Sequence, residues 1–326
     1  MFKKLSKAGI LSQILVIGIL AVVYFITPQV DFPSVADPEP TAPIGVWIYE
    51  LIYNFPTISR PLVILLTITL TIALNAILVR HDISPRQSVF PAIIALVLML
   101  FSPDPYHLIV TLASLLLLLF SLHSVMDLYG EQYPFNQVMN AGVAISIASM
   151  ISPPTIVFSV FIWLGFFTFR INTWREWVIS LMGLILPYFY LALLYLWNDN
   201  LAFAINLYEK LFTNFSFTLQ KPRPLEFISL GIFALWIIIS AMHYYSDTSE
   251  KIISIRKKMW VISHFALAGL AAAFLSGESF LAMLPLVFMP AAAMIAYSVS
   301  SSKRSWIHDT LLLLFFAVAI LNRLNL

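Results

Sequence analysis

Residues 138–170 read VMNAGVAISIASMISPPTIVFSVFIWLGFFTFR, two apolar stretches joined by the break Ile151-Ser152-Pro153-Pro154. The segments FSPDP at 101–105 and LSGE at 275–278 interrupt apolar runs in the same way. Proline and glycine disfavour a continuous helix, so each break predicts a tight helical hairpin at or below a membrane surface. Ser102, Ser152 and Ser276 are expected to cap the returning helices. The alternative is three ordinary turns between slightly longer spans.

The composition is that of a membrane protein. Hydrophobic residues make up 60% of the chain, charged residues make up 10%, and the mean hydropathy is +0.91. Soluble domains are about half apolar and about a quarter charged, so the apolar excess must face lipid. A net charge of +2 gives no support for a nucleic-acid partner. The absence of cysteine excludes disulfides, thiolate nucleophiles and cysteine-ligated metals.

Hydropathy predicts an all-α, polytopic protein with about 11 transmembrane helices in a single integral membrane domain, 1–326. The expected spans are residues 9–27, 61–79, 89–101, 107–126, 138–152, 155–170, 177–197, 226–245, 259–275, 279–298 and 306–322. We interpret the first as an uncleaved helix, because no small-x-small cleavage pattern follows it. With the N-terminus in the cytoplasm, 5 of the 18 Lys and Arg residues face outward and the other 13 (18 − 5) face inward, as the positive-inside rule requires.

Two outward connections are long enough to hold structure of their own. Residues 28–60 and 198–225 are expected to be extracytoplasmic loops with interfacial helices at Ile44–Phe55 and Leu201–Phe215. One interpretation is that both helices are surface connectors that seal the bundle. The other is that they roof an outward-facing groove for a lipid substrate.

A basic and aromatic motif, FRINTWREW, occupies residues 169–177. Thr173 and Glu176 have the spacing of a capping box at the start of a helix. Arg170 and Arg175 are candidate ligands for a phosphate or a lipid headgroup, because guanidinium groups pair well with such anions. The competing interpretation is that both arginines only anchor the loop.

Further candidate substrate- or anion-binding residues are Arg80 and Arg86, which flank a predicted inner turn, and Asp104 and Glu278, which lie at two hairpin tips. The four arginines either converge on one anionic group or hold separate loops at the membrane surface.

Ionisable residues are scarce within the expected spans. No acidic residue lies in the middle of a span, which argues against a simple ion-coupled carrier. His123, His243 and His264 lie nearer span ends and are expected to be interfacial. No two histidines have the spacing of metal ligands on one helix, so we predict neither a metal site nor a cofactor.

Several motifs, in order, resemble an uncharacterised multipass inner-membrane family of Bacteroidota, a family of unknown function. They are the segments 134–142, 147–154, 170–177 and 187–189, together with 80–88 and Phe90-Pro91-Ala92. The resemblance covers about a third of the chain. It implies the inner membrane of a Gram-negative cell envelope and supplies no site residues.

The leading functional hypothesis is the handling of a lipid-linked envelope precursor of the polyprenyl-phosphate type, with sugar transfer at the outer leaflet as one form. The predicted architecture is similar to that of polyprenyl-dependent glycosyltransferases, in which a loop carboxylate acts as base or metal ligand. This resemblance makes Asp31 and Asp37 the candidate catalytic residues, although no paired acidic residues follow the first span. The expected partners are membrane lipid and a lipid-linked saccharide.

Two alternatives stay open, so the sequence does not decide whether the protein is an enzyme. One is a transporter or flippase for an anionic or lipid substrate, in which the arginines hold a phosphate. The other is a non-catalytic membrane scaffold of an envelope or secretion complex.

Overall fold

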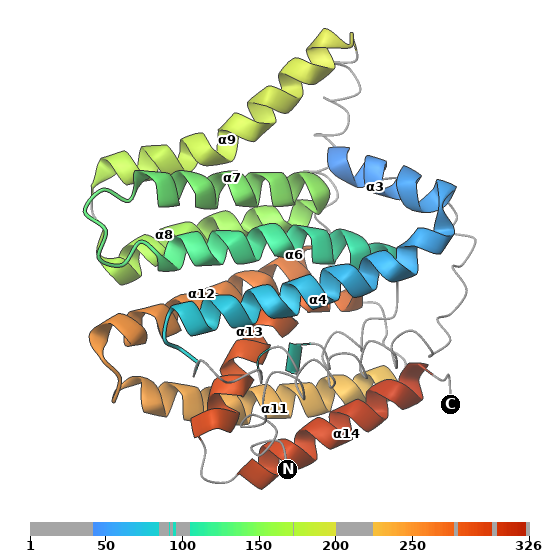
Figure 1. Cartoon of the computed structure of the whole chain (residues 1–326), viewed down its shortest axis with the longest axis vertical. Coiled ribbons are helices and arrows are strands. Elements are labelled where there is room, and N and C mark those ends of the chain that lie inside the picture. Colours follow the sequence, from blue (N-terminus) through green and yellow to red (C-terminus); the bar gives the residue numbers. More distant parts are fainter. Residues whose placement is uncertain are drawn as a thin grey trace.

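A computed structural model of the protein describes residues 42–84, 91, 94–95, 105–171, 173–199, 224–276, 280–301 and 305–323. All regular secondary structure in these ranges is helical (Figure 1), which confirms the expected all-α class for them. The helices are α3 (Pro43–Asn54), α4 (Pro56–Arg80), α6 (Pro105–Met126), α7 (Phe135–Ile151), α8 (Ser159–Phe169), α9 (Trp174–Trp197), α11 (Pro224–Thr248), α12 (Ile253–Leu275), α13 (Phe280–Ser301) and α14 (Ser305–Arg323). A 3₁₀ helix, η1 (Pro153–Phe158), leads into α8.

Six of these helices are long and apolar enough to cross a membrane. Their apolar segments are Pro61–Arg80, Leu108–Met126, Trp174–Trp197, Phe227–Thr248, Ile253–Leu275 and Met283–Ser301. The expected count of about eleven is not supported, because α7 has 17 residues and the apolar helices Pro153–Phe169 and Trp306–Phe315 are also short. The expected span 9–27, and all of 89–101 except residues 91, 94 and 95, lie outside the described residues.

Helix α13 forms the centre of the bundle. It packs against α4, α6, α11 and α12, and 94% of its apolar window is buried inside the protein. Around it the other helices lie in successive layers, ending with α9 on one side and α14 on the other (Figure 1). The last part of α9 extends beyond its neighbours, and Trp197 at its end is 88% exposed.

The break at Ser152 is a tight turn, as the sequence predicts, but the serine side chain does not cap the next helix. Pro153 and Pro154 have no N–H to offer, and the Thr155 N–H donates to the Ser152 carbonyl (3.1 Å) instead. The Ser152 hydroxyl is 3.9 Å from Met283 Sδ. At the end of α12, the Ser276 hydroxyl bonds backward to the Ala273 carbonyl (2.8 Å). Ser102 lies outside the described residues.

Helix α3 confirms the helix predicted at Ile44–Phe55, to within one residue at each end. Its apolar residues divide between two faces, because Trp47 is 64% exposed whereas Ile52 is buried in the core. Its placement on the outer leaflet stays a prediction, and the second expected interfacial helix, Leu201–Phe215, lies outside the described residues.

The connections after α4, α6, α8 and α11 lie at one end of the bundle, on the left in Figure 1. Side-chain contacts agree with this view. His81 after α4 touches His123 of α6, and Tyr129 after α6 packs against Phe169 of α8 and under Lys257 of α12. We call this the basic end, because three of these four connections carry a basic residue: Arg80 at the end of α4, Arg170 after α8 and Lys251 after α11.

Candidate functional site

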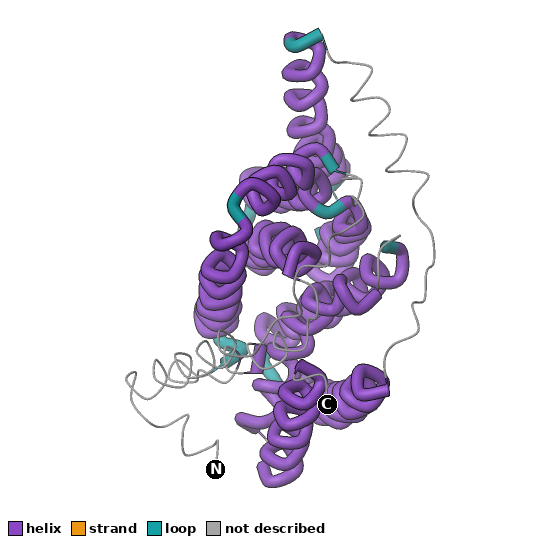
Figure 2. Tube along the Cα trace, turned by 90° about the vertical axis from the view of Figure 1, so that its right-hand side faces the viewer, coloured by secondary structure: helices purple, strands orange, loops and turns teal. Residues whose placement is uncertain are grey.

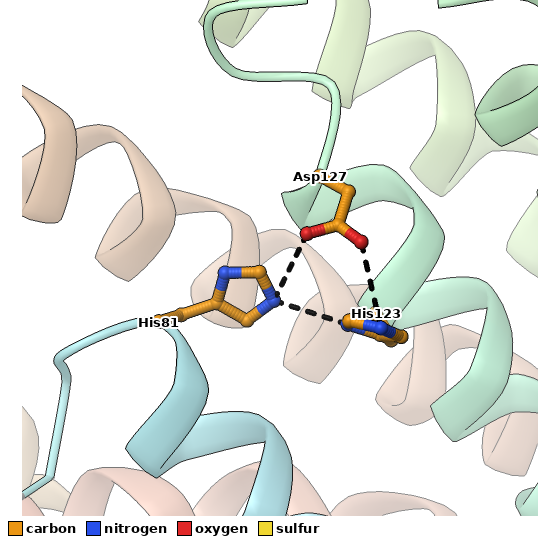
Figure 3. A group of neighbouring side chains, drawn as sticks. All are labelled: His81, His123 and Asp127. Atoms are coloured by element: carbon orange, nitrogen blue, oxygen red, sulfur yellow. Dashed lines mark hydrogen bonds and ion pairs between the residues drawn. The ribbon is translucent and has the colours of Figure 1, made fainter.

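A compact group of polar side chains lies at the basic end. It consists of His81 after α4 and of His123 and Asp127 near the end of α6 (Figure 3). We call these three residues the His–His–Asp cluster. Figure 2 shows that the described residues are helices together with a few loops and turns. Two elements far apart in sequence therefore supply one group of nitrogen and oxygen atoms.

The three side chains are in direct contact. His81 Nε2 lies 3.1 Å from His123 Nδ1 and 3.8 Å from Asp127 Oδ1. His123 Nε2 lies 3.4 Å from Asp127 Oδ2. In Figure 3 all three side chains point toward a common centre.

The backbone explains how this arrangement forms. His123 and Asp127 are four residues apart, which places them one above the other on the same face of the helix and its last turn. The chain leaves α4 at His81 and Asp82. Asp82 has a φ of 58°, which is in the left-handed region. The turn closes with a bond from the Ile83 N–H to the Leu78 carbonyl (2.9 Å), and Ile83 is buried beneath it. This C-terminal cap directs His81 inward.

Burial controls the protonation of His81. Its side chain is only 3% exposed. Burial, and after it the positive charge of Lys258, lower the pKa of His81 to about 4, against the opposing effect of Asp127. The imidazole is therefore neutral at pH 7 and has a free lone pair on one ring nitrogen.

Positive charge surrounds the cluster. Arg80 Nη2 lies 3.5 Å from Asp127 Oδ2, and the Arg80 side chain is 64% exposed. Lys258 is half-buried and interacts electrostatically with Asp127 and Asp82. Lys257 Nζ lies 5.5 Å from the centre of the Tyr129 ring. Two cations, Arg80 and Lys258, thus act on the buried His81 against one carboxylate, Asp127, so positive charge is in excess at this residue.

Of the substrate-binding residues predicted from sequence, the structure places Arg80 at this cluster. Arg170 and Arg175 are exposed around the turn between α8 and α9, and within the described ranges neither has an ion-pair partner. Their convergence with Arg80 on one anion stays a prediction. Arg86, Asp104 and Glu278, and the candidate catalytic residues Asp31 and Asp37, lie outside the described residues.

The predicted capping box at α9 does not form. Thr173 occupies the cap position, but its side chain makes no capping bond. Glu176 is 6% exposed, and its Oε2 is buried without a hydrogen-bond partner. The glutamate has turned into the interior instead of reaching back to the Thr173 N–H.

Sequence reasoning missed the His–His–Asp cluster because it considered only histidine pairs on a single helix. The two histidines are 42 positions apart and come from different helices. One signal was available, since His123 and Asp127 have the i, i+4 spacing that places two ligand side chains together. The position of His81 could not be inferred from any spacing in the chain.

Comparisons with models of protein families, with curated proteins and with solved structures found no match for this chain.

Proposed function

We propose that this chain is an integral protein of a bacterial inner membrane that handles an anionic, lipid-linked envelope precursor of the polyprenyl-phosphate type. In this proposal, Arg80 and Lys258 at the basic end bind the phosphate-bearing headgroup. The observation that carries it is the excess of positive charge around a partly buried polar cluster, at the end of a strongly apolar helix bundle.

The chemistry of the two cations suits a phosphate. Among the described residues, Arg80 makes one long contact of 3.5 Å with Asp127, which leaves most of its five N–H donors without a partner in that part of the chain. Lys258 adds a point charge whose half-buried position lowers screening by water. An isoprenoid tail would lie along the apolar helix surfaces, which in the described ranges expose many leucine, isoleucine and phenylalanine side chains.

Transport of such a precursor and transfer of its sugar both begin with binding of the headgroup. Binding of the headgroup is the step that we propose for this chain. The turn at Arg170 and Arg175, at the same end of the bundle, is the alternative site for the headgroup, and the experiment below distinguishes the two.

The test is native mass spectrometry of the protein purified in mild detergent from its own host. We expect a polyprenyl-phosphate or a lipid-linked saccharide at about one copy per chain. The double variant Arg80→Gln/Lys258→Gln should lose this lipid, whereas the matched variant Arg170→Gln/Arg175→Gln, which removes the same charge from the same end, should retain it.

Three outcomes would contradict the proposal. If only bulk phospholipid is bound, with no specific lipid species, the proposed substrate class is wrong. Loss of the lipid in the Arg170/Arg175 variant alone would move the binding site away from the His–His–Asp cluster. A stoichiometric protein in place of lipid would favour the scaffold alternative.

A further inference from the structure

The His–His–Asp cluster has a property that headgroup binding does not require. Two imidazoles and one carboxylate, one atom from each, lie within 4.8 Å of one another. We propose that His81, His123 and Asp127 bind a divalent transition-metal ion of the zinc type. This inference goes beyond the proposed function and holds whether or not the chain binds a lipid-linked precursor.

The distances are close to those of a metal site. With zinc–ligand bonds of about 2.0–2.1 Å in a tetrahedron, neighbouring donor atoms lie about 3.3 Å apart. Taking one donor atom from each residue, His81 Nε2 lies 3.1 Å from His123 Nδ1 and 3.8 Å from Asp127 Oδ1, and all three donors lie within 4.8 Å of one another. Side-chain rotations that shorten the longest of these separations to about 3.3 Å would bring the three donors to one ion.

The donor set selects the class of metal. Imidazole nitrogen suits zinc, copper, nickel and iron, whereas magnesium and calcium prefer oxygen ligands only. Two histidines with one carboxylate recur in zinc sites where the fourth position is left to water or substrate. An ion here would therefore keep one coordination position open.

The competing explanation is a network of hydrogen bonds alone. In that case the contact between His81 Nε2 and His123 Nδ1 holds a proton, and Asp127 is occupied by Arg80 and His123. The two explanations differ in one measurable respect, because only a metal site binds one ion per chain with an affinity that depends on all three residues.

The chain provides a matched control on α11. His243 and Asp247 have the same i, i+4 spacing as His123 and Asp127, and His243 Nε2 lies 3.8 Å from Asp247 Oδ2. The other described partner of His243 is the Ser301 hydroxyl (3.0 Å). Among the described residues, only the His–His–Asp cluster gathers three metal-ligating groups.

The experiment uses the full-length protein in detergent, stripped of metal with a chelator and titrated with Zn²⁺ or Co²⁺. We expect one ion per chain by elemental mass spectrometry and calorimetry, and a tetrahedral Co²⁺ absorption spectrum. His123→Ala and Asp127→Asn should each weaken binding at least about tenfold, since even residues behind the direct ligands contribute that much. His243→Ala should bind as the wild type does.

A second measurement uses the wild-type protein, so its result does not depend on whether the variants fold. X-ray absorption of the Zn²⁺-loaded protein should show imidazole nitrogen at about 2.0–2.1 Å. The proposal is overturned if the wild type takes up no stoichiometric ion. It is equally overturned if the X-ray absorption spectrum shows no imidazole nitrogen bound to Zn²⁺. The same holds if His243→Ala weakens Zn²⁺ binding as much as His123→Ala does.

Discussion

At the residue scale, the site depends on a few side chains whose positions are fixed by helix ends. His81 is directed inward by the turn that ends α4, and Asp127 lies where the last turn of α6 opens. The sequence made Arg80 a candidate anion ligand, and the structure adds the carboxylate of Asp127 as its partner. The pairing could not be predicted, because it depends on how two helices pack and not on any local spacing.

Arg80 provides a prediction that separates metal binding from simple ion pairing. It competes with a cation for Asp127 and adds a repelling charge, so Arg80→Gln should strengthen Zn²⁺ binding about fivefold. This corresponds to about 1 kcal/mol, the upper range for an exposed ion pair. Isothermal titration calorimetry of the variant measures the change.

The control for this prediction is Arg175→Gln, which removes another exposed charge, at the turn between α8 and α9. It should leave the affinity unchanged. Weaker Zn²⁺ binding in Arg80→Gln would mean that Arg80 holds Asp127 in place and does not compete for it.

At the scale of elements, the sequence predicted most helices well and their contacts hardly at all. The expected spans 107–126 and 259–275 end at the same residues as α6 and α12, because hydropathy and turn residues are local properties. The 3₁₀ helix η1 was not expected, and it begins with the two consecutive prolines, Pro153 and Pro154. Which helices pack against each other depends on individual side chains at their interfaces, and the apolar composition of a helix does not identify those side chains.

Glycines show how α7 and α9 come together. A Cβ on Gly142 would lie 2.9 Å from the Ser180 carbonyl oxygen, and a Cβ on Gly183 would lie 2.8 Å from the Met139 carbonyl oxygen. Such contacts with backbone cannot be relieved by moving a side chain. The two helices therefore approach closely through small residues, as membrane helices often do.

We therefore expect Gly142→Ala and Gly183→Ala each to destabilise the protein by about 1–3 kcal/mol, the usual effect of overpacking. Unfolding in detergent, followed by circular dichroism, measures the change.

Gly231 of α11 is the matched control, because a Cβ there meets nothing within 4 Å. Gly231→Ala should be neutral or should stabilise the protein by up to about 1 kcal/mol through helix propensity. Equal effects of all three substitutions would contradict the close approach of α7 and α9.

At the scale of the whole molecule, charge is distributed unequally between the two ends. Arg80, Arg170, Arg175 and the positive residues of 251–258 all belong to the basic end, whereas Arg60 lies at the opposite end of α4 (Figure 1). The sequence predicted this alternation from loop charges alone. One connection at the basic end, 127–137, has no basic residue of its own. Asp127 and Tyr129 of this loop face Arg80 and Lys257 from neighbouring segments.

This asymmetry predicts the orientation of the chain in the membrane, with the basic end in the cytoplasm. The chain has no cysteine, so a single introduced thiol reports its own position without background. Glu131 is exposed at the basic end, and Asn198 is exposed after α9 at the other end. In spheroplasts, a membrane-impermeant maleimide should label Asn198→Cys directly and Glu131→Cys only after permeabilisation. Reversed labelling would invert the orientation and place the His–His–Asp cluster outside. Labelling of both from one side would contradict the passage of α9 across the membrane, because α9 is the helix that separates the basic end from Asn198.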